Sequence, residues 1–178
     1  MINRTAVFAG TFDPFTIAHE HIVNKAQHLF DKIIIAIGEN STKTCMLSTK
    51  KRKEIIEKVF NKNKNFAYNK IEIKSYSGLT VDFCKQYNCR YILRGLRNSV
   101  DFEYEKTTAG INKLLNSNIE TVFILSETEY SFISSSVVRE IVRHNGDLTS
   151  FLPSNISTEE FYSDYLQYKN DIPNTKHQ

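Results

Sequence analysis

The chain has 178 residues, a length that suits one domain, and its 40% hydrophobic and 24% charged residues are ordinary for a globular protein. The formal net charge of +3 is too small to indicate a nucleic-acid-binding or membrane-surface protein. The three cysteines show no C-x-x-C spacing, so neither a disulfide framework nor a zinc site is indicated. We therefore expect a cytoplasmic protein with free thiols. We expect no signal peptide, no membrane span and no nucleic-acid partner.

Short β-branched and apolar runs alternate along the chain with longer amphipathic patterns. Strands are predicted over residues 5–10, 32–38, 66–75, 90–94 and 120–125. Helices are predicted over residues 17–30, 49–60, 79–87, 100–115, 134–144 and 158–168, with a polar tail from Asn170. The alternation predicts an α/β fold, a Rossmann-like, doubly wound, five-stranded parallel sheet with helices on both faces. Residues 1–157 should form a single domain, and residues 158–178 should add a helix and a tail to it.

Unusual residues follow the first predicted strand, in the string G-T-F-D-P-F-T-I-A-H from Gly10 to His19. In doubly wound sheets, ligands bind beyond the carboxyl ends of the strands, where the strand order reverses. Here the free N–H groups of a helix start favour an anion, Thr16 can cap the helix, and the imidazole of His19 can reach a bound phosphate. The alternative is a Pro-containing turn with a capped helix and a surface histidine.

Basic residues follow the second predicted strand. Lys43 stands in a polar loop, where a lysine is usually solvated, but its place after a parallel strand favours a ligand contact. Residues 50–53 (K-K-R-K) resemble a nucleic-acid patch, yet they have no interleaved aromatic residues. A solvated helix face is the preferred interpretation.

Two arginines flank a glycine at the end of the fourth predicted strand, in the string Arg94-Gly95-Leu96-Arg97. Guanidinium groups bind phosphates through two parallel hydrogen bonds, which favours an anion at this place. The alternative is a salt bridge to Asp101, Glu103 or Glu105.

Three serines, 134–136, stand at the start of a predicted helix. Their hydroxyl and backbone N–H groups suit an anion, or they form a redundant N-cap, with Ser134 or Ser135 in the capping position.

These strings resemble the bacterial phosphopantetheine adenylyltransferase family, part of a nucleotidyltransferase superfamily with an H-x-G-H or T-x-G-H motif. The family patterns are G-T-F-D-P-x-T-x-G-H for Gly10–His19, R-G-L-R-x-x-x-D-F-E-Y-E for Arg94–Glu105 and W-S-F-I-S-S-S for Tyr130–Ser136. The likeness runs from about Ala6 to Leu152. Ala18 departs from the motif's Gly and puts a methyl group where backbone meets nucleotide, although alanine suits a helix.

The resemblance implies transfer of the adenylyl group of ATP to 4'-phosphopantetheine, a step of coenzyme A biosynthesis that yields dephospho-coenzyme A and pyrophosphate. It implies catalytic roles for His19, Lys43 and Arg94. Acceptor binding is implied for Thr11, Lys43, Leu79, Thr80 and Arg94. ATP binding is implied for Gly10, Thr11, Phe12, His19, Gly95, Leu96, Arg97, Glu105, Tyr130, Ser131, Phe132, Ile133, Ser134, Ser135 and Ser136. No residue is predicted to ligate a metal, and Mg²⁺ should accompany ATP. A homohexamer and feedback binding of coenzyme A follow from the resemblance alone.

The acceptor phosphate is largely dianionic at neutral pH, so no general base is needed and catalysis should come from positioning and charge stabilisation. Two other functions remain open. One is a sister nucleotidyltransferase acting on nicotinamide mononucleotide or transferring cytidylyl groups, which the Arg94–Glu105 string disfavours. The other is a non-catalytic nucleotide or nucleic-acid binder disabled by Ala18, which the otherwise intact motifs disfavour.

Overall fold

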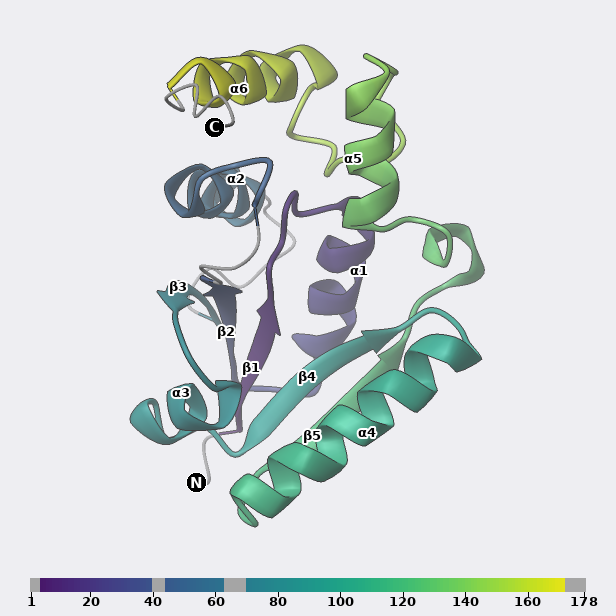
Figure 1. Cartoon of the computed structure of the whole chain (residues 1–178). Helices are drawn as coiled ribbons and strands as arrows, with labels where there is room; N and C mark the ends of the chain where they lie inside the picture. Colours follow the sequence, from purple (N-terminus) through teal and green to yellow (C-terminus); the bar gives the residue numbers. More distant parts are fainter. Residues whose placement is uncertain (1–3, 40–43, 63–69, 172–178) are drawn as a thin grey trace, which may run out of the picture.

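A parallel sheet of five strands forms the centre of the computed structural model, which describes residues 4–39, 44–62 and 70–171 (Figure 1). The strands are β1 (Thr5–Gly10), β2 (Lys32–Gly38), β3 (Ile71–Tyr76), β4 (Tyr91–Leu96) and β5 (Glu120–Leu125). Their order is β3-β2-β1-β4-β5, so the direction of winding reverses between β1 and β4. The predicted α/β fold with a doubly wound parallel sheet is confirmed.

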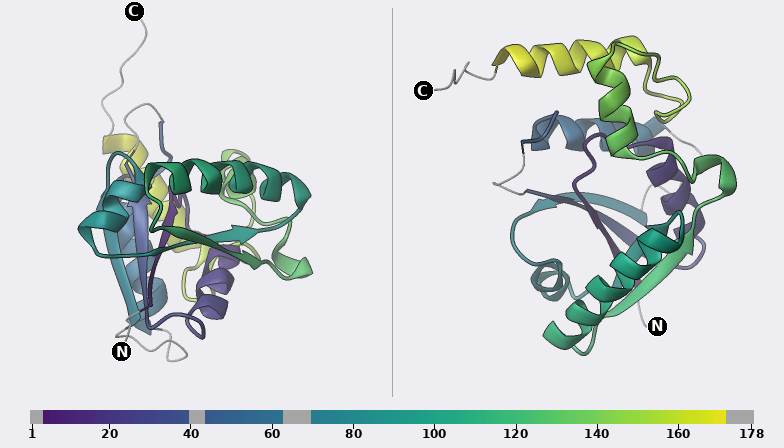
Figure 2. Two further views of the ribbon diagram at one scale, coloured as in Figure 1. Left: turned by 90° about the horizontal axis from the view of Figure 1, so that it is seen from below. Right: turned by 45° about the vertical axis from the view of Figure 1, so that its right-hand side comes forward.

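Helices cover both faces of this sheet, as Figure 2 shows. They are α1 (Ile17–Ala26), α2 (Thr49–Lys62), α3 (Thr80–Gln86), α4 (Ser99–Leu115), α5 (Ser135–Arg143) and α6 (Thr158–Asp171), with a short 3₁₀ helix, η2 (Thr128–Tyr130). None of the helices in the described ranges is both long enough and apolar enough to span a bilayer.

Alternate residues of the central strands enter two separate hydrophobic cores. In β2, Ile33 and Ile35 pack with residues of α1, α2 and α5, whereas Ile34 and Ala36 pack with residues of α3. All four side chains are inaccessible or nearly so. This burial on both faces explains why the strand is apolar at nearly every position rather than at every second one.

Most predicted boundaries agree with the structure to within one or two residues, and the larger differences lie in α1, β3 and α6. Helix α1 ends at Ala26 rather than at residue 30, because the chain turns there to let the Asp31 N–H donate to the Arg4 carbonyl at 3.0 Å. Phe30 is nonetheless buried against Tyr91, so the apolar periodicity identified the inward side chain but not the helix end. Strand β3 begins at Ile71, and residues 66–69 of the predicted strand lie outside the described ranges. Helix α6 continues to Asp171.

The C-terminal helix rests on α2 (Figure 1). Lys58 forms an ion pair with Glu160, and Lys51 Nζ lies 2.8 Å from Asp164 Oδ1. Just before α6, Asn155 Nδ2 donates to the Lys58 carbonyl at 2.8 Å. These contacts tie the end of the chain to the helix that follows β2, on the same side of the sheet as α1.

Candidate active site

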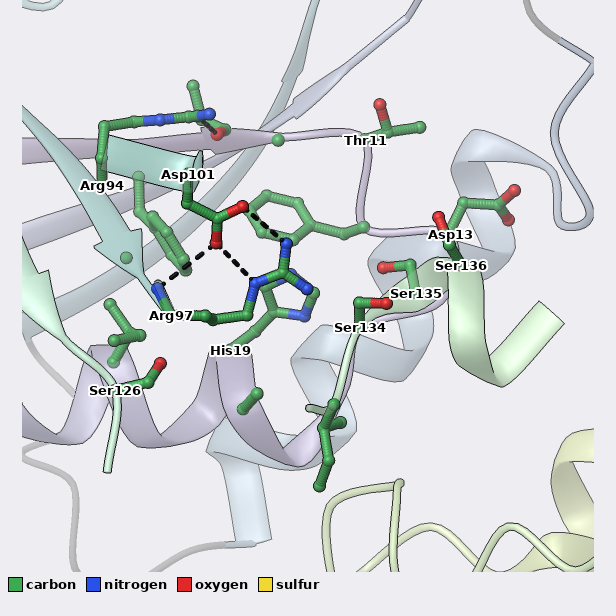
Figure 3. Close-up of a pocket in the computed structure, with 18 of the residues that line it drawn as sticks. Thr11, Asp13, His19, Arg94, Arg97, Asp101, Ser126, Ser134, Ser135 and Ser136 are labelled. Atoms are coloured by element: carbon green, nitrogen blue, oxygen red, sulfur yellow. Dashed lines mark hydrogen bonds and ion pairs between the residues drawn. The ribbon is translucent and has the colours of Figure 1, made fainter. Parts of the chain in front are cut away.

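A cavity opens at the carboxyl ends of β1 and β4, where the winding of the sheet reverses (Figure 3). The loop after β1, the start of α1, the end of β4, the first turns of α4 and the start of α5 form its walls. Its lining includes the predicted residues Gly10, Thr11, Phe12, His19, Gly95, Arg94, Arg97, Glu105, Ile133, Ser134, Ser135 and Ser136. The fold therefore brings together motifs that lie more than a hundred residues apart in the sequence.

A second cavity adjoins the first along the sheet edge. Its lining includes Gly38 at the end of β2 and the segment from Tyr76 to Thr80, which contains the predicted Leu79 and Thr80. Both cavities are lined by Ala9, Gly10, Thr11 and Arg94. The two spaces therefore meet at the end of β1, with one arginine reaching both.

His19 is held by the helix start that it helps to form. Thr16 is the N-cap of α1, and the Nδ1 atom of His19 accepts a hydrogen bond from the Thr16 N–H at 3.0 Å. This is the arrangement of a capping box, with His in the position usually held by Glu or Gln. A backbone N–H can only donate, so Nδ1 is the acceptor and the neutral ring carries its proton on Nε2. Among the described residues, none bonds Nε2.

Burial in the cavity wall lowers the pKa of His19 to about 3, and the positive charges of Arg97 and Arg94 lower it further in the same direction. The imidazole is therefore neutral at physiological pH. A neutral ring with its proton on Nε2 can donate a hydrogen bond to an anion in the cavity without carrying a charge of its own.

The loop that precedes α1 is anchored by the side chain of Asp13, which is 3% exposed. Its two carboxylate oxygens accept the backbone N–H groups of Met46 and Leu47, at 2.7 and 2.9 Å. Asp13 was not predicted as a site residue, because Asp-Pro is an ordinary turn sequence.

Two side chains of helix α5 also bind the loop that precedes α1. Arg139 Nη1 donates to the Asp13 carbonyl at 2.7 Å, and Ser135 Oγ donates to the Pro14 carbonyl at 2.8 Å. Arg139 also lines the cavity and was not predicted. Its place three residues after the serine triplet was the signal that could have identified it, since a helix residue three positions on lies over the same face.

Each of the two predicted anion-binding arginines has a carboxylate partner. Arg94 Nε donates to Glu105 Oε2 at 2.7 Å, the same guanidinium makes a second bond to that carboxylate, and Nη1 donates to the Ala9 carbonyl. Arg97 makes two side-chain bonds to Asp101, at 2.7 and 3.0 Å (Figure 3). The alternative prediction, that these arginines form salt bridges to nearby acidic residues, is therefore confirmed for Glu105 and Asp101. However, both pairs line the cavity, so the carboxylates fix guanidinium groups that remain within reach of a ligand.

The serine triplet has three different sets of contacts. Ser134 is the N-cap of α5, and its Oγ accepts from the Val137 N–H at 3.2 Å. Ser135 anchors the loop before α1, as described above, and Ser136 Oγ accepts from Arg139 Nη2 at 2.9 Å. The first backbone N–H groups of α5, which have no partner within a helix, stand at the cavity wall with these residues.

Four predicted ATP-binding residues do not line either cavity. Leu96 is buried beneath the site, and Ser131 Oγ bonds to the Thr128 carbonyl. Phe132 is largely exposed. Tyr130 packs on His21, with ring centroids 4.6 Å apart. Lys43 lies outside the described residues. Ala18, the departure from the family motif, is buried and lines the first cavity.

A cavity that joins two arginines, a neutral histidine and a helix start at the switch point of a parallel sheet is typical of nucleotide-transferring enzymes. Residues 7–141 match the model of the Cytidylyltransferase-like family. The chain is 45% identical over 150 residues to a phosphopantetheine adenylyltransferase of Pelagibacter ubique, covering 84% of this chain and 92% of that protein. It is 44% identical over 157 residues to the enzyme of that name from Flavobacterium johnsoniae, covering 88% and 99%. The chain belongs to the phosphopantetheine adenylyltransferase family.

Solved structures of more distant proteins share the fold. A Plasmodium falciparum nicotinic acid mononucleotide adenylyltransferase complexed with NaAD aligns over 94% of this chain and 98% of its own, with a TM-score of 0.68 and 20% identity. A bifunctional NMN adenylyltransferase/ADP ribose pyrophosphatase from Francisella tularensis, complexed with AMP and a manganese ion, aligns over 95% of this chain and 52% of its own. Its TM-score is 0.71 at 16% identity. At such identities the likeness establishes the fold alone.

The charge state of His19 is directly measurable. We expect ¹⁵N NMR of the ligand-free protein to show a neutral His19 ring with its proton on Nε2 throughout the range from about pH 5 to 8, because burial holds its pKa near 3. A protonation midpoint near the ordinary value of 6.5 would contradict the geometry. The unfolded chain binds this proton near pH 6.5 and the folded chain only near pH 3, so the free energy of unfolding should fall as the pH drops below about 6.5.

Proposed function

We propose that the protein transfers the adenylyl group of ATP to 4'-phosphopantetheine, producing dephospho-coenzyme A and pyrophosphate. The observation that carries this proposal is the meeting of two cavities at Thr11 and Arg94. A transfer between two substrates needs two adjoining binding spaces with the reacting atoms at their junction. The first cavity has the helix starts and guanidinium groups that suit a triphosphate, and the second has a mixed lining that suits an acceptor arm.

The choice of acceptor rests on the relatives of 44–45% identity, which carry the name phosphopantetheine adenylyltransferase. The structural neighbours that act on nicotinamide or nicotinic acid mononucleotide are only 16–20% identical and support the fold alone. A sister enzyme with a mononucleotide acceptor is therefore the second candidate. The string from Arg94 to Glu105, whose two arginines both line the cavity, favours the first.

In this reaction an oxygen of the acceptor phosphate attacks the α-phosphorus of ATP. A new phosphorus–oxygen bond forms, the bond from the α-phosphorus to the bridging oxygen of the β-phosphate breaks, and its electron pair leaves with pyrophosphate. The acceptor phosphate has a second pKa near ~6, so it already carries the reacting electron pair at neutral pH. The protein need not remove a proton, and it accelerates the step by orientation and charge stabilisation.

We assign roles in this reaction to four side chains. Arg94, with Lys43, holds the acceptor phosphate. His19 donates the hydrogen bond of Nε2 to an oxygen of the α-phosphate as charge builds in the transition state. Arg97 and the start of α5 hold the β- and γ-phosphates.

The ion pairs of the two arginines are compatible with these roles. A guanidinium has five N–H donors, and Arg94 uses three of them for Glu105 and Ala9. The remaining donors are available to a phosphate, and the bound carboxylate limits the rotamers of the arginine before substrate arrives. Glu105, predicted to contact the nucleotide, acts in this scheme by orienting Arg94.

Magnesium enters this scheme as part of the Mg·ATP substrate. Within the described ranges, no group of three or more His, Cys, Asp or Glu side chains is placed to hold a metal ion. The cavity carboxylates of Asp13, Asp101 and Glu105 are all engaged by protein donors. Phosphate oxygens and water are therefore the ligands that suit Mg²⁺ here.

We also propose a homohexamer in the cytoplasm with feedback binding of coenzyme A. The apolar side chains of Val100, Ile111 and Leu114 in α4 are 53–89% exposed, which supports a contact between subunits. Light scattering should give six times the chain mass of 20.6 kDa, and a monomer would contradict the assembly. Coenzyme A contains both the adenylyl and the pantetheine portions of the product, so it should span both cavities and inhibit transfer. The free thiols of Cys45, Cys84 and Cys89 suit a reducing compartment.

The function is tested by measuring pyrophosphate release from Mg·ATP with each of two acceptors. We expect rapid release with 4'-phosphopantetheine and none with nicotinamide mononucleotide, and the first reaction should yield dephospho-coenzyme A by mass spectrometry. Release only with the mononucleotide would establish the sister enzyme instead. Folded protein that binds ATP but is inactive with both would indicate a non-catalytic binder in which Ala18 has disabled transfer.

The role of His19 can be separated from its capping of α1. His19→Gln should keep the helix cap, since Gln is a usual capping-box residue in this position. With its Oε1 bonded to the Thr16 N–H, however, its flexible amide no longer donates from the fixed position of the imidazole Nε2. We expect kcat to fall roughly 10²-fold or more in both His19→Gln and His19→Ala, the scale of one preorganised donor. Only His19→Ala should also lower the melting temperature. Unchanged kcat in His19→Gln would remove His19 from the chemistry.

A further inference from the structure

Arg52 is buried in the middle of a run of cations. It lies in the first turn of α2 and is 3% exposed, whereas its neighbours Lys51 and Lys53 pair with acidic residues nearer the surface. The interpretation of residues 50–53 as one solvated helix face is therefore wrong for Arg52. A buried cation is costly unless its charge and hydrogen bonds are compensated, so the position calls for an explanation.

Hydrogen bonds satisfy only some of the donors of Arg52, and no described carboxylate neutralises its charge. Nη1 donates to the Thr11 carbonyl at 2.5 Å and lies 3.4 Å from the Gly38 carbonyl, and Nη2 donates to Thr49 Oγ1 at 2.9 Å. All three acceptors are neutral. Nε is buried without a hydrogen-bond partner, and in the described part of the chain no carboxylate forms an ion pair with this guanidinium.

The two carbonyl groups that Arg52 binds lie at the edge of the second cavity. Gly38 ends β2, Thr11 directly follows β1, and both line the second cavity together with Arg94. Carbonyl groups at the carboxyl ends of parallel strands present partial negative charge to a ligand and would repel a phosphate. Arg52 lies behind this wall, binds these carbonyls and adds one positive charge without lining either cavity itself.

We propose that Arg52 is a positioning residue for the acceptor phosphate, which supplies positive charge from behind the Thr11–Gly38 wall and fixes the Thr11 carbonyl so that the wall accepts an anion. The proposal rests on the proposed function, because it assumes a phosphorylated acceptor in the second cavity. The negative charge of that phosphate would then compensate the guanidinium that the described residues leave uncompensated. A structural buttress, the competing explanation, would act equally on acceptors with and without a phosphate.

Isothermal titration calorimetry with 4'-phosphopantetheine and with pantetheine, which lacks the phosphate, separates the two explanations. Arg52→Gln removes the charge but keeps a donor, Arg52→Lys keeps the charge, and Lys53→Gln is a control on the exposed side of the same helix. In Arg52→Gln we expect the preference for the phosphorylated acceptor to fall roughly 10-fold, the scale of one nearby charge in a partly buried site. Arg52→Lys should retain part of the preference and Lys53→Gln all of it.

Equal weakening of both acceptors, or an unchanged preference, in Arg52→Gln would overturn the proposal. If Arg52→Gln does not fold, Arg52→Met takes its place, because it also removes the charge while keeping an unbranched apolar side chain. The same loss of preference is expected, and equal weakening of both acceptors or an unchanged preference would again overturn the proposal. Wild-type protein without any preference for the phosphorylated acceptor would instead refute the proposed function.

Discussion

The path of the chain from Thr11 to Thr16 is the constraint on which the site depends. Phe12 adopts a φ of 50°, a left-handed conformation that costs a side-chain-bearing residue on the order of 1 kcal/mol. Its ring is buried and packs so closely on Gly10 that a Cβ atom there would lie 2.9 Å from the ring. The carbonyls on either side, those of Thr11 and Asp13, are bound by Arg52 and Arg139. The loop can therefore keep this conformation, and it places Thr16 at the N-cap of α1 and His19 at the cavity in a fixed orientation.

Each of the four arginines at this edge of the sheet is held in place by an acceptor group of the protein. Arg52 and Arg139 bind backbone carbonyls, whereas Arg94 and Arg97 bind the carboxylates of Glu105 and Asp101. Fixed donors do not need to reorganise when negative charge moves from one phosphate to another, and this is the condition under which electrostatic stabilisation is most effective. The neutral state of His19 fits the same arrangement, because a third charge between two guanidinium groups would be unfavourable.

The sequence was sufficient to predict the fold and most of the cavity, because both depend on local patterns. Apolar strands that alternate with amphipathic helices specify a parallel sheet, and a sheet of this type places its loops at one edge. The motif residues at the ends of β1 and β4 accordingly line the cavity. The partners of Arg94 and Arg97 could only be narrowed to three acidic residues, because several rotamers satisfy the same spacing.

Contacts between segments that are distant in the sequence could not be predicted from local patterns. The burial of Arg52 depends on how α2 approaches the ends of β1 and β2, and the sequence shows only one cation among four. The bonds of Asp13 to Met46 and Leu47 likewise join segments more than thirty residues apart. Tyr130 was predicted to contact ATP, but it packs on His21, a residue without an assigned role in the sequence analysis.

In the proposed reaction, fixed charges and a neutral donor stabilise the transition state without a general base. The most direct test is the pH dependence of the rate constant for a single turnover, measured with enzyme in excess over the acceptor and with saturating Mg·ATP. We expect one rise, at or below the free phosphate's second pKa of ~6 because the nearby cations favour its dianion, followed by a level rate up to about pH 9. A further transition within the level range that disappears in His19→Gln would show that His19 exchanges a proton during transfer, and it would contradict catalysis by a neutral donor.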